Sequence, residues 1–144
     1  MIYLIYQRTG GCFIMGYESK VYICSRISNN TYIYNEVIAA VDMCKMGYDS
    51  GWAELFSKKL DGAFLGFDYG NPRNQDWENT ELLDAYDKPM LYADIDTVKE
   101  WVNNQIDNGN DYIRLFVLKA VLDSFDKTRW ESDRAKLIVV HYGY

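Results

Sequence analysis

The sequence predicts an α+β fold, with a mainly antiparallel sheet of five to seven strands and two or three helices packed on one face. Three observations predict it. Runs rich in Ile, Val and Tyr alternate as strands do near both ends of the chain. Segments between them carry apolar residues at helical spacing. Turn residues separate the segments, and no linker or repeat divides residues 1–144, so we expect a single compact domain.

The first part of the chain is expected to consist of strands. Residues 1–7 alternate as a strand, and residues 12–15 return as a second strand after the Arg8–Gly11 turn. A third strand is expected over Ser19–Ile27. The stretch Ser28–Asn30 then marks a turn, because Asn favours turn conformations.

Two helices are expected next. Over residues 35–47 apolar residues recur at helical spacing, with Asn35 as the N-cap. These apolar residues are Val37, Ile38, Val41 and Cys44. A second helix is expected over Ser50–Leu60, with Gly62 just past its end. Its apolar face would consist of Trp52, Leu55, Phe56 and Leu60. Residues 63–67 then form a short strand.

The middle of the chain, residues 68–79, reads as a long polar loop, and loops of this length are often functional. After it we expect a short helix over Thr80–Tyr86 and a strand over Pro89–Ala93. A helix from Asp96 to Asp107 follows, and Asn108-Gly109 ends it.

The segment Tyr112–Leu122 is long and apolar, so periodicity alone does not distinguish a strand from a helix. We predict a strand, because Arg114 and Lys119 fit a helix face poorly and the segment follows a helix closed by Asn-Gly. Residues 126–134 then form a polar connection to a final strand over Ala135–Tyr142.

Little in the sequence supports an enzyme. His141 is the only histidine and lies in a run of strand residues, so we expect a hydrogen-bonded sheet histidine rather than a catalytic base. Motifs for phosphate loops, nucleophile elbows and dinucleotide binding do not occur. Asp94 and Asp96 could hold a divalent cation together with Asp87, but capping of the helix that begins there is the better interpretation. We therefore predict no catalytic residue, no metal site and no cofactor.

Three widely spaced cysteines, Cys12, Cys24 and Cys44, form neither a disulfide framework nor a CxxC site. We expect three free, buried thiols and hence a reducing, cytoplasmic setting. No run of the sequence approaches the roughly 20 apolar residues of a membrane span. Residues 1–8 lack the basic region of a signal peptide, so we expect a soluble protein without one.

Negative charge is concentrated in one segment. The net charge of the chain is −6, and residues 76–96 hold seven acids and one base, so the rest of the chain is neutral. Such a local field steers a basic partner. A chain without a basic stripe is a poor direct binder of nucleic acid, because that affinity depends on neutralising phosphates. The bases of residues 127–136 are interleaved with acids, so we expect that stretch to be a solvated connection of mixed charge.

The strongest functional signal is therefore residues 68–96, which combine a long loop, negative charge and aromatic side chains of the kind that dominate interfaces. We predict a surface that binds a basic partner protein, formed by Tyr69, Asp76, Trp77, Glu78, Glu81 and Asp84. The chain would then be a non-enzymatic inhibitor or accessory protein that occupies the nucleic-acid-binding surface of another protein.

The short, acidic, aromatic-rich format is similar to that of small accessory proteins of phages and mobile elements, which favours an anti-defence role. Two alternatives stay open. A ligand-binding or sequestering protein would stack a nucleotide-like ring on its aromatics and meet phosphates with Arg8, Arg26 and Arg114. The other alternative is a small cysteine- or carboxylate-dependent enzyme.

Overall fold

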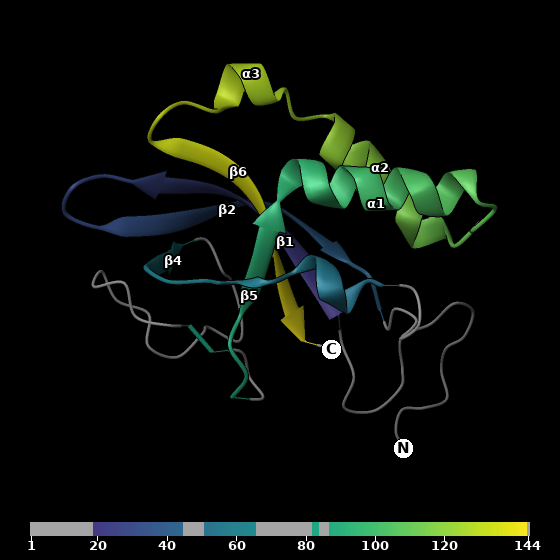
Figure 1. Cartoon of the computed structure of the whole chain (residues 1–144), viewed down its shortest axis with the longest axis horizontal. Helices are drawn as coiled ribbons and strands as arrows, with labels where there is room; N and C mark the ends of the chain where they lie inside the picture. The colour runs from purple at the N-terminus through teal and green to yellow at the C-terminus, as the bar shows by residue number, and fades with distance from the viewer. Residues whose placement is uncertain (1–18, 45–50, 66–81, 84–86, 144) are drawn as a thin grey trace.

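Six strands form one curled sheet in the computed structural model, which describes residues 19–44, 51–65, 82–83 and 87–143 (Figure 1). The strands are β1 Ser19–Ser28, β2 Ile33–Asp42, β3 Lys58–Lys59, β4 Ala63–Leu65, β5 Leu91–Asp94 and β6 Ala135–Gly143. Their order is β3-β5-β6-β1-β2-β4. Only β2 and β4 pair in parallel, so the sheet is mainly antiparallel as predicted.

The two central strands, β1 and β6, are covered on both faces. They pair from Ser19 opposite Gly143 to Ile27 opposite Ala135. Because side chains alternate along a strand, Val21 packs into one apolar cluster and Tyr22 into a second cluster on the other face. Burial on both faces explains why these strands read as nearly continuous apolar runs.

The helices are α1 Ile95–Asp107, α2 Ile113–Asp123 and the short α3 Lys127–Trp130, and a 3-10 turn, η1, spans Ala53–Leu55. α1 and α2 pack on one face of the sheet and supply six of the fifteen buried residues of the first cluster (Figure 1). Their fully buried side chains are Ile95, Val98, Val102, Leu115, Leu118 and Leu122. The α+β prediction is confirmed. Within the described residues no helix is long and apolar enough to cross a membrane.

The helix predicted over residues 35–47 is wrong, because residues 33–42 form β2. The pairing of β2 with β1 shifts register between Ile23 and Cys24, so that Ile38 is an extra residue in β2. Such a β-bulge interrupts the period-two alternation. The apolar residues on either side of it therefore fall at spacings that resemble a helix.

The helix predicted over Ser50–Leu60 is also wrong: only η1 is helical there, and β3 follows it. The residues assigned to one helix face are indeed buried, but on different sides of the sheet. Trp52 and Phe56 belong to the first cluster, whereas Leu60 belongs to the second. The segment therefore passes around the edge of the sheet.

Two further elements differ from those predicted. The Thr80–Tyr86 helix is wrong at its described residues, because Leu83 forms an antiparallel bridge with Pro89. The strand predicted over Tyr112–Leu122 is wrong, because this segment is α2. Leu115, Leu118 and Leu122 face the core at helical spacing. The apolar residues on the outer side of α2 hide that period in the sequence.

The remaining elements agree with the sequence. The strands expected over Ser19–Ile27, 63–67, Pro89–Ala93 and Ala135–Tyr142 correspond to β1, β4, β5 and β6, and the helix expected from Asp96 is α1. Residues 126–134 form the expected connection, which contains α3. The predictions for residues 1–7, 12–15 and 68–79 lie outside the described residues.

Gly62 is the position at which the backbone itself demands glycine. Its φ is +84°, and a Cβ there would collide with the carbonyl oxygen of Ile33 on β2. We expect Gly62→Ala to lower the free energy of unfolding by about 2–4 kcal/mol, from the strained φ and the clash together. Gly109→Ala is the matched control, since its φ is +95° and a Cβ there meets nothing within 4 Å. That variant should lose only about 1 kcal/mol, and equal losses in urea titrations would contradict the clash.

Candidate functional site

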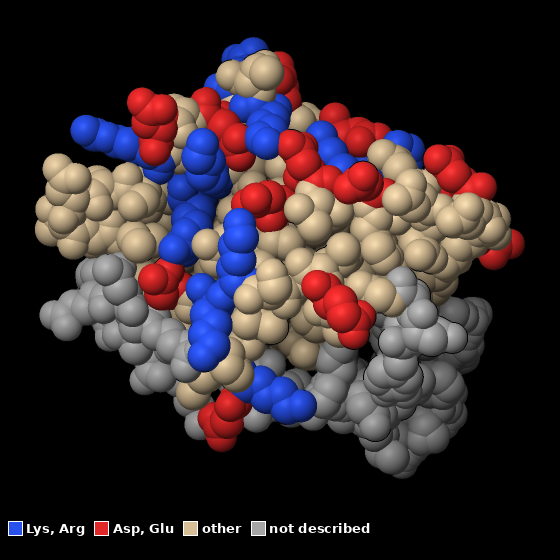
Figure 2. Space-filling model, viewed as in Figure 1, with Lys and Arg blue, Asp and Glu red and all other residues tan. Residues whose placement is uncertain are grey.

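A groove of about 360 Å³ opens on the face of the sheet that carries the second apolar cluster. It is lined by Arg26, Lys58, Tyr92, Asp94, Lys127, Glu131, Lys136 and Ile138. Its four bases come from β1, β3, α3 and β6, which are far apart in the sequence. Figure 2 shows Lys and Arg side chains gathered in a band that runs down from α3 over this face.

The guanidinium group of Arg26 is held rigidly at one side of the groove. Nη1 donates hydrogen bonds to Oδ1 of Asn35 (2.9 Å) and to the backbone oxygen of Asp61 (3.2 Å). Nη2 pairs with the Asp61 carboxylate, and the guanidinium carbon lies 5.0 Å from the centre of the Tyr92 ring. These contacts fix the plane of the guanidinium group, and Asp61 supplies its anionic partner.

Asn35 provides the support for this arrangement. It is fully buried, and its Nδ2 donates to the backbone oxygens of Asp61 (2.9 Å) and Ala63 (3.0 Å). The residue predicted to cap a helix therefore fixes the segment that carries Asp61 against β2. A buried amide with all these partners is well satisfied.

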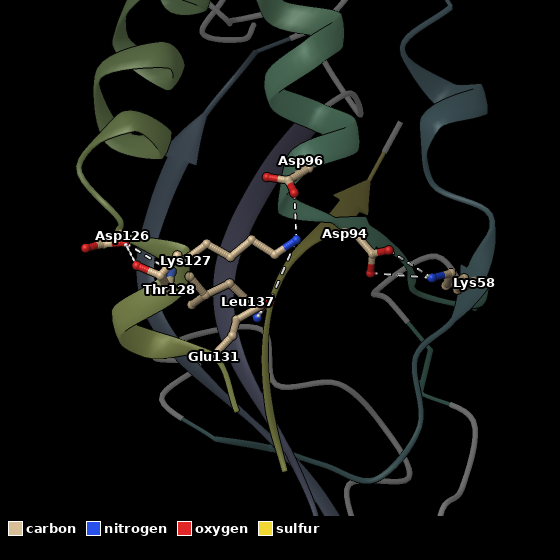
Figure 3. A network of polar contacts seen from close by, with 8 residues as sticks. All are labelled: Lys58, Asp94, Asp96, Asp126, Lys127, Thr128, Glu131 and Leu137. Carbon is tan, nitrogen blue, oxygen red and sulfur yellow. Dashed lines mark hydrogen bonds and ion pairs between the residues drawn. The ribbon is translucent and has the colours of Figure 1, made fainter. Parts of the chain in front are cut away.

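The lysines at the other side of the groove take part in a surface ion-pair network (Figure 3). Lys58 Nζ lies 3.3 Å from Oδ2 of Asp94. Lys127 Nζ lies 2.6 Å from Oδ2 of Asp96 and 3.7 Å from Oε1 of Glu131. The hydrogen bond that the Lys127 ammonium group donates to Asp96 raises the pKa of Lys127. Because solvent-exposed pairs add little stability, both ammonium groups can change partner at small cost.

Lys136 differs from the other three bases. It is exposed on β6, directly opposite Arg26 on β1. Like charges that face each other across two strands are unfavourable. Arg26 has the Asp61 carboxylate, whereas the Lys136 ammonium group has no acidic partner within the described part of the chain. An anion in the groove would relieve this repulsion.

Two of the acids interleaved with bases around α3 accept hydrogen bonds from backbone N–H groups. Asp126 caps α3 by accepting from the backbone N–H of Thr128 (3.0 Å) and from its hydroxyl group (2.7 Å), which lowers the pKa of Asp126. Glu131 accepts from the backbone N–H of Leu137 (2.8 Å), and its side chain is only 14% exposed. Arg134 and Lys136 have no acidic partner among the described residues. Glu131 is thus largely shielded from solvent, whereas Arg134 and Lys136 are exposed.

The predicted partner-binding residues, Tyr69, Asp76, Trp77, Glu78, Glu81 and Asp84, lie outside the described residues, so that surface stays a prediction. Two other acids of the same segment are Asp94 and Asp96, which pair with lysines at the groove. Asp94 takes the N-cap position of α1, but its side chain makes no capping hydrogen bond.

The arginines expected to meet phosphates do not converge. Arg26 lines the groove, whereas Arg114 donates to the backbone oxygen of Asp42 near the opposite end of the β1–β2 hairpin. Arg8 lies outside the described residues. Lys58 and Tyr92 carry no sequence signal for this role, and the bases of residues 127–136 are interleaved with acids. Only strand register and the position of α3 bring these side chains together.

His141 and Cys24 show no catalytic arrangement in the described structure. The His141 ring shares a 3.1 Å hydrogen bond with Ser19 Oγ and stacks 5.0 Å from the Phe56 ring, as expected for a sheet histidine. Cys24 is a free, fully buried thiol, and burial raises its pKa. Within the described residues no group of His, Cys, Asp and Glu could hold a metal ion.

Cys44 corrects the expectation of three free thiols, because it is disulfide-bonded. Pairing depends on the distance between cysteines in the folded chain, which their wide spacing in the sequence does not reveal. Cys12 lies outside the described residues.

Comparison with protein-family models, with curated proteins and with solved structures finds no match.

The two described cysteines should differ in an alkylation experiment on air-oxidised protein. In denaturant without reductant, iodoacetamide should label Cys24 and leave Cys44 unlabelled, and both should be labelled after reduction. In the native protein Cys24 should also resist labelling, because the thiolate is the reactive form and burial disfavours it. Peptide mass spectrometry reads out each site, with Cys24→Ser as the control. Labelling of Cys44 before reduction would contradict the disulfide.

Proposed function

We propose that this chain is a binding protein, not an enzyme, and that its groove takes a small anionic ligand of the nucleotide class. The observation that carries the proposal is the pair of cations, Arg26 and Lys136, that face each other across β1 and β6. Only Arg26 has an acidic partner among the described residues. A phosphate group between them would provide the missing negative charge.

The chemistry of the lining supports this ligand class. Four of the lining residues are bases and two are acids, although the whole chain has a net charge of −6. Guanidinium and ammonium groups form short, charge-assisted hydrogen bonds with phosphate oxygens. The volume of about 360 Å³ lies within the range of small-ligand sites. Tyr92 and Ile138 provide an apolar floor for a ring.

The ion pairs of Lys58 and Lys127 are compatible with this role. Their side chains are 52% and 42% exposed. Exposed pairs are screened by solvent and weakly held. Both ammonium groups can therefore turn towards a phosphate when the ligand enters, while Arg26 keeps its position.

Binding of ATP and of tripolyphosphate, measured by isothermal titration calorimetry at low salt, tests the proposal. We expect ATP to bind more tightly than tripolyphosphate, and added salt to weaken both. Lys136→Gln should weaken ATP binding about tenfold, because it removes the unpaired charge. The matched control is Lys119→Gln, since Lys119 bonds Asn103 and Asp123 on the helical face of the sheet.

Three outcomes would count against the proposal. If ATP does not bind, or if both lysine variants lose affinity equally, the groove is not the site. Equal affinity for ATP and tripolyphosphate would show that the groove recognises the phosphates and not the ring of the nucleotide.

A second candidate function rests on the charge distribution of the sequence. We propose that the segment containing Asp76 to Asp84 binds a basic protein, as an inhibitor of a nucleic-acid-binding or defence protein would. The seven acids against one base over residues 76–96 favour it.

Its test is a pull-down from host lysate with the intact chain and with a variant in which Asp76, Glu78, Glu81 and Asp84 are neutralised. A single basic protein should be captured by the intact chain only, and released by salt. Capture of the same protein by the neutralised variant would refute this second function.

The compartment is part of the same proposal. The cytoplasm expected from the sequence agrees with the free thiol of Cys24, whereas disulfides such as that of Cys44 are typical of oxidising compartments. The alkylation experiment, repeated on protein whose thiols are blocked inside cells, decides between a reducing and an oxidising compartment.

A further inference from the structure

α2 presents an apolar stripe to solvent on the side away from the core. Among the described residues five large apolar side chains are exposed, and three of them lie on α2: Ile113 (71%), Phe116 (45%) and Val117 (48%). Ile113, Val117, Ala120 and Ser124 follow each other at spacings of four, three and four residues, which places them in one line along a helix. This is the spacing of a helix-pairing seam.

The other two exposed apolar residues, Ile38 (43%) and Trp130 (54%), line a groove of about 470 Å³ at the C-terminal end of this stripe. The remaining lining residues are Ser25, Glu36, Ser124, Phe125 and Leu137. Ser124 belongs both to the stripe and to the groove. The stripe therefore meets the apolar groove at Ser124.

We propose that a second copy of this chain covers this surface, with the two α2 helices antiparallel. A two-fold interface brings the same surface of both copies together. Ile113, its most exposed side chain, lies at the N-terminal end of α2, and the groove lies about 16 Å further along the helix. When two copies of α2 lie antiparallel, each Ile113 meets the groove of the other copy beside Ser124 and Trp130.

The area of the surface agrees with the requirement of a stable dimer. Residues of this size have roughly 150–250 Å² of surface each, so the exposed parts of the five apolar residues add up to the order of 500 Å². A standard interface buries about 800 Å² on each partner, and homodimer interfaces are about 65% apolar. The stripe and groove supply about that apolar share, and the polar residues around them supply the rest.

This inference does not rest on the proposed function. α3 separates the two grooves, with Lys127 and Glu131 lining the charged groove and Trp130 lining the apolar one. The two proposals can therefore fail separately: loss of dimerisation leaves the charged groove intact, and loss of ligand binding in Lys136→Gln leaves the stripe intact.

Sedimentation equilibrium of the full chain tests the proposal. We expect a dimer, and a dissociation constant raised tenfold or more by Ile113→Lys and also by Trp130→Ala. Because both changes break the same contact between copies, the double variant should be hardly weaker than either single one. Ala53→Lys, on exposed η1, is the matched control and should leave the dissociation constant unchanged. Thermal melts followed by circular dichroism confirm that each variant folds.

A cross-link tests the arrangement of the helices. Ala120 lies near the middle of the stripe, so Ala120→Cys should form a disulfide-linked dimer on oxidation, and Ala53→Cys should not. A monomer at all concentrations up to about 100 µM would overturn the proposal, even if another protein is found to cover the stripe. A dimer that is insensitive to Ile113→Lys and Trp130→Ala would overturn it equally.

Discussion

The pairing of β1 with β6 is the interaction on which the rest of the structure depends. It joins residues more than one hundred positions apart in the chain, from Ser19 opposite Gly143 to Ile27 opposite Ala135. β2 and β4 extend the sheet beyond β1, and β5 and β3 extend it beyond β6. Both apolar clusters include side chains from this central pair. A contact of such long range must close a large loop before it is stabilised by packing.

The same pairing places the two candidate surfaces back to back. Leu137 and Ile138 are neighbours on β6, so their side chains point to opposite faces. Leu137 lines the apolar groove and Ile138 lines the charged groove. α3 forms the wall between them, and the hydrogen bond from Leu137 N–H to Glu131 fixes the end of that wall on β6. A single short connection thus lines both the charged groove and the apolar groove.

The sequence predicted the elements whose residues have one simple environment. β6 is buried on both faces, so its sequence is a continuous apolar run. α1 has one buried face, so its apolar residues recur with a helical period. β2 was mistaken for a helix because the bulge at Ile38 breaks its alternation. α2 was mistaken for a strand because Ile113, Phe116 and Val117 are apolar on its exposed side. In both segments an additional constraint, a bulge or an outward-facing apolar stripe, disturbs the pattern that the core alone would produce.

The charged groove was beyond prediction for a different reason. Net charge and charge runs are properties of the sequence, whereas a binding site depends on which side chains share a face. Glu131 and Asp126 accept hydrogen bonds from backbone N–H groups, and Glu131 also pairs with Lys127, but neither pairs with Lys136. Arg26 and Lys136 become opposite only through the register of β1 and β6, which no local pattern specifies. An acidic chain can therefore carry a groove lined mainly by bases, because strand register, rather than composition, decides which charges share a surface.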